Sequence, residues 1–290
     1  MLIVLGFIAG KKLNAKKETI ASILIYVVAP IVIFNSIVTT KITFQLLLLP
    51  LIFFICCSFI CILFYLLGGV LFKDNTKNLL ALAAGTANTG YFGIPVAIEF
   101  LGEQAVGIMI LGILGFTVFE NSLGFFIIAR GNHTGRDSIL RLLKLPTVYA
   151  FLIGLLVNFF GLQLGKNYLS FAGNFIGAYT VLGMMLIGLG LSDMKSFKLD
   201  LKFLLSAFGA KFVIWPLLIG MLVFVDVNFI SIFNSSVHKV MILLSVMPLA
   251  ANLVAFSTEL RAQPEKASLV VFLSTLVALI YVPLLITLLT

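Results

Sequence analysis

The sequence predicts an all-helical integral membrane protein, on the basis of three features of the 290-residue chain. Hydrophobic residues make up 61% of the chain and charged residues only 10%, a composition far from that of water-soluble globular proteins. Apolar runs of about 17–25 residues alternate with short polar stretches, which fits membrane-spanning helices rather than the strands of a barrel. Two of these runs are interrupted by asparagine and proline. We therefore expect a helical bundle in which two helices are broken.

Division at the polar loops gives ten candidate spans. They cover residues 1–10, 19–39, 43–72, 78–100, 104–129, 146–163, 168–192, 201–225, 238–258 and 266–289. The first is short, because ten helical residues rise only about 15 Å, half of a hydrocarbon core of about 30 Å. It is expected to be a partial helix, or else the N-terminus is truncated.

The basic residues set the expected orientation. They lie in short loops and form no continuous stripe, so the net charge of +8 does not indicate a nucleic-acid partner. Most of the 19 lysines and arginines follow the first, third, fifth, seventh and ninth spans, whereas the alternate loops hold only Lys41, Lys166 and Lys239. The positive-inside rule then places both termini outside the cytoplasm, in a multi-pass protein of the cell membrane.

A polar linker at 131–145 divides the chain into two halves, 1–130 and 146–290, with five candidate spans each. An odd number of spans per half makes the two halves enter the membrane from opposite sides, which is the layout of an inverted repeat. Each half has its interruption in its fourth span. We therefore expect two inverted five-helix repeats with spans four and nine broken.

The first interruption is Asn88-Thr-Gly-Tyr-Phe-Gly-Ile-Pro95. A proline lacks an N–H and disfavours helical geometry in the residue before it. The second interruption holds Pro248 and Asn252. Broken backbone within a bilayer is tolerated only where protein or a wet cavity satisfies its polar groups, so paired breaks indicate a binding site. Each proline taken singly also fits an ordinary helix kink.

The chain resembles the auxin efflux carrier family of membrane transporters in both interruptions and in further segments of nearly its whole length. These segments are Tyr26-Val-Val-Ala-Pro-Ile-Val-Ile-Phe-Asn-Ser36, Ala210-Lys-Phe-Val-Ile-Trp-Pro216 and Ala267-Ser-Leu-Val-Val-Phe-Leu-Ser-Thr275. The resemblance implies a fold related to bile acid/sodium symporters and sodium/proton antiporters, in which helices four and nine cross at mid-membrane. It also implies a core of spans three to five and eight to ten, with spans one, two, six and seven in a separate bundle that can form a homodimer.

The chemistry of such a crossing favours an anion. The first N–H groups of each half-helix have no partner and are open to a ligand, so its start carries about half a positive charge. Pro95 and Pro248 suit the first turns of the two half-helices. Amide side chains add donors and acceptors, and glycines allow close approach of backbone to ligand. Asn35 and Ser36 in span two, and Tyr179 and Thr180 in span seven, either line the cavity or form helix–helix hydrogen bonds. The expected substrate-binding residues are Asn35, Asn88, Thr89, Gly90, Tyr91, Gly93, Pro95, Thr180, Pro248 and Asn252.

Two charged residues fall inside predicted spans, and both are candidates for ion coupling. Glu120, followed by Asn121, is deep in span five, where a carboxylate costs about 2.5–3.5 kcal/mol to insert. It either carries a proton or cation, or is a structural partner of Lys211 in span eight. Lys211 can bind a substrate carboxylate, reach an interface, or form this ion pair, which is the favoured interpretation.

No enzyme signature is recognisable in the sequence. His133 and His238 lie in opposite loops, and we expect no metal site and no cofactor beyond a coupled H⁺ or Na⁺. We therefore expect a secondary active transporter of a small organic anion, such as an auxin-, malonate- or malate-like carboxylate, that works by alternating access. The alternatives are a monovalent cation/proton antiporter that uses Glu120, and a membrane sensor that binds without transport.

Overall fold

The computed structural model describes residues 1–39, 48–102, 105–162, 164–192 and 199–289, and every regular element in these ranges is helical. Lys41, which contributed to the predicted orientation, lies outside them, as do Lys195 and Lys198 in the loop after predicted span seven. The all-helical class predicted from composition is confirmed for the described residues.

Six helical segments are long and apolar enough to cross a membrane, namely 17–39, 48–71, 105–130, 166–192, 201–230 and 264–286. A seventh is formed if α9 (Gly135–Leu143) and α10 (Pro146–Phe159), which meet at a bend of 52°, act as one span. The six segments match predicted spans two, three, five, seven, eight and ten. Predicted spans one and six are short helices, α1 (Leu2–Leu13) and α10. Predicted spans four and nine are interrupted, so the arrangement of ten spans in inverted repeats stays a prediction.

Several long segments contain π-helical turns between α-helical parts. Segment 17–39 comprises α2 (Lys17–Ile23), a π turn (Leu24–Val28) and α3 (Ala29–Thr39); α4 (Leu48–Leu71) is uninterrupted. Segment 105–130 comprises α7 (Ala105–Phe119), a π turn (Glu120–Gly124) and α8 (Phe125–Arg130). Segment 201–230 comprises α12 (Leu201–Gly209), a π turn (Ala210–Ile214), α13 (Trp215–Val225) and a last π turn (Asp226–Ile230). Such π turns are frequent at functional sites. Here two of them carry Glu120 and Lys211.

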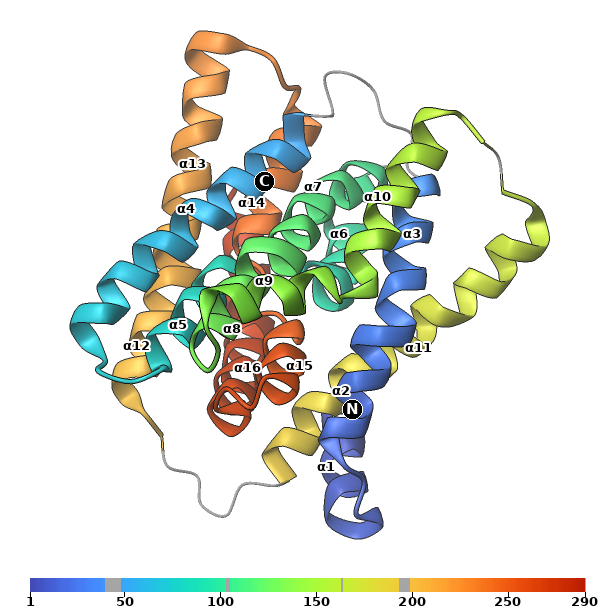
Figure 1. The fold of residues 1–290 in the computed structure, drawn as a ribbon. Helices are drawn as coiled ribbons and strands as arrows, with labels where there is room; N and C mark the ends of the chain where they lie inside the picture. Colours follow the sequence, from blue (N-terminus) through green and yellow to red (C-terminus); the bar gives the residue numbers. More distant parts are fainter. Residues whose placement is uncertain (40–47, 103–104, 163, 193–198, 290) are drawn as a thin grey trace.

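The helices form two bundles (Figure 1). In the first bundle, α1 packs on α11 (Lys166–Ser192), and α3 packs on α10 and α11. In the second bundle, α4 packs on α5 (Thr76–Gly85) and α7, and α13 packs on α14 (Ser235–Ser245). In Figure 1, α4, α12 and α13 lie along one edge of the molecule and α11 and α1 lie toward the opposite edge. These contacts match the division into bundles that the family resemblance implies.

The helix pair α1 and α11 approaches closely because glycines face the partner backbone. A Cβ atom built on Gly6 would lie 2.0 Å from the backbone oxygen of Met185, and one on Gly188 would lie 1.9 Å from that of Ile3. No side chain fits in such a gap, since real Cβ atoms essentially never approach closer than 3.0 Å. Small residues at helix interfaces are the usual way for membrane helices to pack without a hydrophobic driving force.

Both predicted interruptions are present in the structure. Helix α5 ends at Gly85, Thr86 is extended, and helical structure resumes with a π turn (Thr89–Gly93) that leads into α6 (Ile94–Leu101). Helix α14 ends at Ser245, and α15 (Asn252–Glu259) begins after a non-helical stretch at 246–251. The two stretches meet, because the backbone N–H of Asn88 donates to the carbonyl of Pro248 over 2.7 Å.

Neighbouring side chains satisfy the freed backbone groups near each break. The indole N–H of Trp215, which is fully buried, donates to the carbonyl of Ala84 over 2.7 Å. The backbone N–H of Leu249 donates to the hydroxyl of Ser274, in α16 (Pro264–Leu289), over 3.1 Å. Protein therefore supplies the partners that water cannot supply within a bilayer.

The exchange Trp215→Phe is expected to lower the free energy of unfolding by roughly 1–3 kcal/mol, because it keeps an aromatic ring but leaves the buried Ala84 carbonyl without its donor. Thermal unfolding of the detergent-solubilised protein measures the effect. Phe224→Leu, at an exposed position of the same helix, is the control. Equal melting temperatures for the wild type and Trp215→Phe would show that this hydrogen bond does not stabilise the break.

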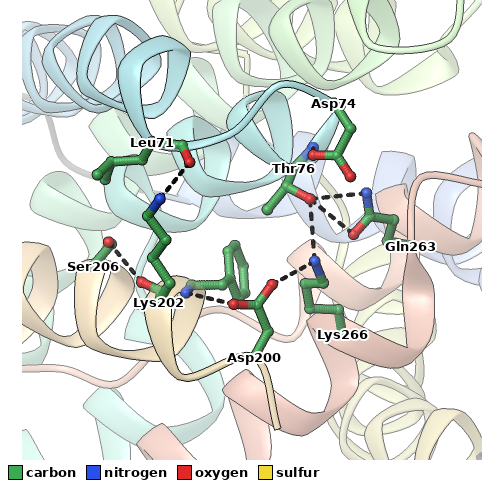
Figure 2. Close-up of polar contacts among 9 residues, drawn as sticks. Leu71, Asp74, Thr76, Asp200, Lys202, Ser206, Gln263 and Lys266 are labelled. Carbon is green, nitrogen blue, oxygen red and sulfur yellow. Dashed lines mark hydrogen bonds and ion pairs between the residues drawn. The ribbon is translucent and has the colours of Figure 1, made fainter. Parts of the chain in front are cut away.

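A polar cluster joins three turns at one end of the second bundle (Figure 2). Lys266 Nζ lies 2.9 Å from a carboxylate oxygen of Asp200 and 3.1 Å from the hydroxyl of Thr76, which also contacts Gln263. Burial raises the pKa of Asp200, but the contacts with Lys266 and the backbone N–H groups at the start of α12 outweigh it and leave the pKa below its ordinary value. The cluster fixes the start of α12 relative to α5 and α16.

Candidate functional site

A cavity of about 260 Å³ lies at the crossing of the two interrupted helices. Most of the predicted site residues line it. They are Asn35, Asn88, Thr89, Gly90, Glu120, Asn121, Thr180 and Asn252. The remaining wall is largely apolar and comes from α3, α6, α7, α11 and the two non-helical breaks. A mostly apolar cavity with a few convergent polar groups is the usual form of a small-molecule site.

Two amide oxygens in this cavity have no hydrogen-bond partner among the described residues, namely Oδ1 of Asn35 and Oδ1 of Asn88. Both residues are buried. The Asn88 amide nitrogen lies 3.9 Å from the sulfur of Met184. A buried amide oxygen without a partner is costly, so these groups indicate that a ligand or water completes the site.

The carboxylate of Glu120 takes part in a chain of hydrogen bonds across the cavity. Asn252 Nδ2 donates to Glu120 Oε2 over 2.7 Å, and the hydroxyl of Tyr179 donates to Asn252 Oδ1 over 2.9 Å. Glu120 is 4% exposed. The chain links α11 of the first bundle to α15 and to the π turn after α7, so the predicted carboxylate and the second predicted amide are in direct contact.

Lys211 does not form the predicted ion pair. Its Nζ is fully buried, has no hydrogen-bond partner among the described residues, and lies over the rings of Trp215 at 4.6 Å and Phe116 at 5.8 Å. Glu120 instead binds the amide of Asn252. The prediction of a direct contact was wrong because the π turn that carries Lys211 directs its side chain into an aromatic cluster. Phe116 lines the cavity and Lys211 does not.

The structure places the other predicted site residues as follows. Gly93 is outside the cavity and close to Met109 and Met247, where a Cβ atom would clash. Pro248 contributes its carbonyl to the crossing, but it precedes the first residue of α15 by four positions, so it is not in the first turn of that half-helix. Pro95 is in the first turn of α6, which follows a π turn rather than the break itself. Only the backbone is described for Pro95 and Tyr91.

The N–H groups that begin the half-helices are partly satisfied within the chain. Those of Leu253 and Val254 donate to the carbonyls of Ala250 and Ala251, and that of Thr89 donates to the carbonyl of Ala87. The prediction that the first N–H groups are all open to a ligand was therefore too broad. The amide side chains are the more direct candidates for ligand contacts.

Two contacts involve residues that are not among the expected substrate-binding residues. Tyr179, which was expected either to line the cavity or to form a helix–helix hydrogen bond, does both, since it lines the cavity and donates to Asn252. Glu259, at the end of α15, accepts hydrogen bonds from the hydroxyls of Ser22 and Tyr26, each over 3.0 Å. Because Glu259 falls at a span boundary, its charge alone does not set it apart from the residues of a loop. Both contacts join the two bundles.

Two further cavities clarify the extent of the site. One of about 10 Å³ lies on the other side of Tyr179 and Asn252 and is lined by Leu24, Ile25 and Phe256 among others. A larger hollow of about 520 Å³ lies beside the polar cluster of Figure 2, against Asp200 and Lys266. We place the site at the crossing, because there both backbone breaks, the buried carboxylate and the unpartnered amides converge.

No group of three or more His, Cys, Asp or Glu side chains that could hold a metal ion occurs within the part of the chain that the structure describes. The three cysteines, Cys56, Cys57 and Cys61, are buried and free. The site therefore consists of amides, hydroxyls and one carboxylate. Such groups bind solutes by hydrogen bonds and charge.

The fold and its apolar helices define a multi-pass membrane protein, and similar proteins define its class as a transporter. An uncharacterised transporter of Methanocaldococcus jannaschii is 33% identical over 230 residues, which cover 74% of each chain. An uncharacterised transporter of Methanothermobacter thermautotrophicus is 26% identical over 294 residues, which cover 98% of this chain and 94% of the relative. No protein-family model matches the chain. The chain belongs to the same family as the M. jannaschii transporter.

Proposed function

We propose that this protein is a secondary active transporter that moves a small organic anion by alternating access. The observation that carries the proposal is the cavity at the crossing, where the amides of Asn88 and Asn252 lie between two helical bundles. Amide N–H groups bind carboxylates, and the starts of two half-helices add positive potential. Relatives named as transporters favour transport over catalysis.

The proposal includes the finer architecture implied by the resemblance to auxin efflux carriers. In it, α1 and α10 complete a set of ten spans in two inverted five-helix repeats, and the two interrupted helices are spans four and nine. The contact between Asn88 and Pro248 at the breaks supports this arrangement. A homodimer formed through the first bundle stays a prediction.

The two bundles contact each other differently on the two sides of the crossing. The cavity extends to Asn35, Ser36 and Thr39 on α3. On the opposite side lies the cavity of about 10 Å³, and Glu259 joins α15 to α2 and to the π turn that follows it. With the orientation predicted from the basic residues, the site faces outward here and Glu259 closes the cytoplasmic side. Alternating access then requires the Glu259 contacts to break.

Uptake into proteoliposomes tests the proposed function. We expect uptake of at least one member of a panel of mono- and dicarboxylates, driven by a pH or a sodium gradient imposed separately. Protein-free liposomes are the control. The absence of uptake of every carboxylate, together with uptake of neutral or cationic solutes, would contradict the proposal.

A second candidate function, monovalent cation/proton antiport, is favoured by a specific observation. The unpartnered oxygens of Asn35 and Asn88 and the carboxylate of Glu120 are all acceptors, which suit a cation. Cation flux coupled to protons without any organic solute would support this candidate. Carboxylate binding without flux of any solute would indicate a sensor instead.

A further inference from the structure

We propose that Glu120 and the carboxylate of the substrate compete for the same donor, the side-chain amide of Asn252. When the substrate takes this donor, Glu120 binds one proton, so that the anion and the proton bind together. Tyr179 is the positioning residue that makes this exchange possible. The inference rests on the proposed function and names its coupling ion, for which H⁺ and Na⁺ were the alternatives.

The geometry fixes the direction of the Asn252 amide. An asparagine amide has an oxygen that accepts and a nitrogen that donates. Tyr179 donates to the oxygen over 2.9 Å, so the nitrogen must face the other way, where it lies 2.7 Å from Glu120 Oε2. Rotation of the amide would place its oxygen against the carboxylate and lose both bonds. Tyr179 belongs to α11 and therefore holds the amide from the opposite bundle.

Repulsion between the two carboxylates then couples the binding of the anion to the binding of the proton. A substrate carboxylate that takes a donor of Asn252 comes close to the Glu120 carboxylate in a site that excludes most water, where like charges repel strongly. Protonation of Glu120 removes this repulsion and weakens the competing hydrogen bond. In the unliganded site, by contrast, the Asn252 amide favours the ionised form of Glu120. The proton and the anion therefore bind with positive coupling, which is reciprocal by thermodynamic necessity.

The other titratable groups near Glu120 do not account for the coupling between the anion and the proton. Lys211, on the π turn after α12, and Cys57, on α4, interact with it electrostatically. Within the described residues, α5 and α10 also pack against the π turn of Glu120 but present no interacting titratable group. Lys211 favours the carboxylate charge, as Asn252 does. Burial of the Glu120 carboxylate opposes both effects, and the repulsion from an incoming anion adds to burial in favouring the protonated form.

Calorimetric titration of the purified wild type with lactate and with malate tests the inference. Titrations in buffers of different ionisation enthalpy give the number of protons taken up on binding. Between about pH 6 and pH 8, where simple carboxylates are ionised, we expect net proton uptake and an affinity that falls by up to about tenfold per pH unit, the limit for one coupled proton. Binding without proton uptake would overturn the inference and leave the proposed function intact. The absence of binding of any carboxylate would overturn both.

Single exchanges at Glu120 and Tyr179 test whether these residues couple the binding of the anion to the binding of the proton. Glu120→Gln, which is permanently neutral, should bind the same anion without proton uptake and with a flat pH profile, whereas the exposed Glu99→Gln should behave as the wild type. Tyr179→Phe should weaken binding by about 3- to 10-fold and make the pH profile shallower, because the amide is free to rotate. Tyr149→Phe, which loses a hydroxyl bonded to the Leu143 carbonyl, is the matched control. A Tyr179→Phe protein with the pH profile of the wild type would remove Tyr179 from the mechanism.

Discussion

Gly188→Ala is expected to prevent stable folding of the first bundle. The added Cβ atom would lie 1.9 Å from the carbonyl oxygen of Ile3 and 2.6 Å from the backbone nitrogen of Phe7, and backbone atoms cannot move aside as a flexible side chain can. Overpacking in well-packed cores typically costs about 1–3 kcal/mol, and a backbone clash of this depth exceeds the usual case. The yield of monodisperse protein in detergent and its melting temperature measure the loss.

Gly177→Ala is the matched control, because Gly177 lies on the same helix and a Cβ atom there meets nothing within 4 Å. This exchange should be neutral or should stabilise the helix by up to about 1 kcal/mol, since alanine favours helical backbone over glycine. If both variants melt at the same temperature, the close approach of α1 and α11 does not exist in the protein.

Asn88→Ala is expected to weaken carboxylate binding by about 10- to 100-fold while the fold is kept. A hydrogen bond to a charged group contributes about 1.5–3 kcal/mol, which corresponds to this range. The exchange separates binding from structure, because Asn88 supports the crossing with its backbone N–H and not with its side chain. Removal of the side chain also eliminates an unpartnered buried oxygen. Titration with the carboxylates transported by the wild type measures the affinity.

The control is Asn228→Ala on the π turn after α13, which is exposed and bonds only to the Phe224 carbonyl among the described residues. It should bind as the wild type does. An Asn88→Ala protein with unchanged affinity would show that the side-chain amide does not bind the anion.

The sequence predicted the membrane class and both interruptions, because proline, glycine and asparagine within apolar runs act locally on the backbone. It also predicted that Asn88, Glu120 and Asn252 belong to one site, since breaks placed in corresponding spans indicate where the halves meet. Local signals do not determine which partner a buried side chain selects. Lys211 therefore lies among aromatic rings rather than beside Glu120. The start of the first half-helix also differs from the prediction, because the π turn at 89–93 separates the first break from α6.

The partners of Glu259 and Asn252 could not be predicted for a different reason. Ser22 and Tyr26 are more than 230 positions away from Glu259, and Tyr179 is 73 positions away from Asn252. Contacts between the bundles depend on how whole helices are placed, and a single sequence carries no direct signal for such pairs. In the alternating-access mechanism that we propose, these long-range contacts are the ones that must break and form again.

The bond between Asn88 and Pro248 has a consequence for how such a protein can diversify. It joins main-chain atoms on both sides, so no side-chain exchange at either position abolishes it except the introduction of proline at position 88. Side chains around this hydrogen bond can therefore be substituted, and the bound solute can change, while the contact between the two breaks is kept. The solute specificity of such a transporter can therefore evolve without a change of its fold.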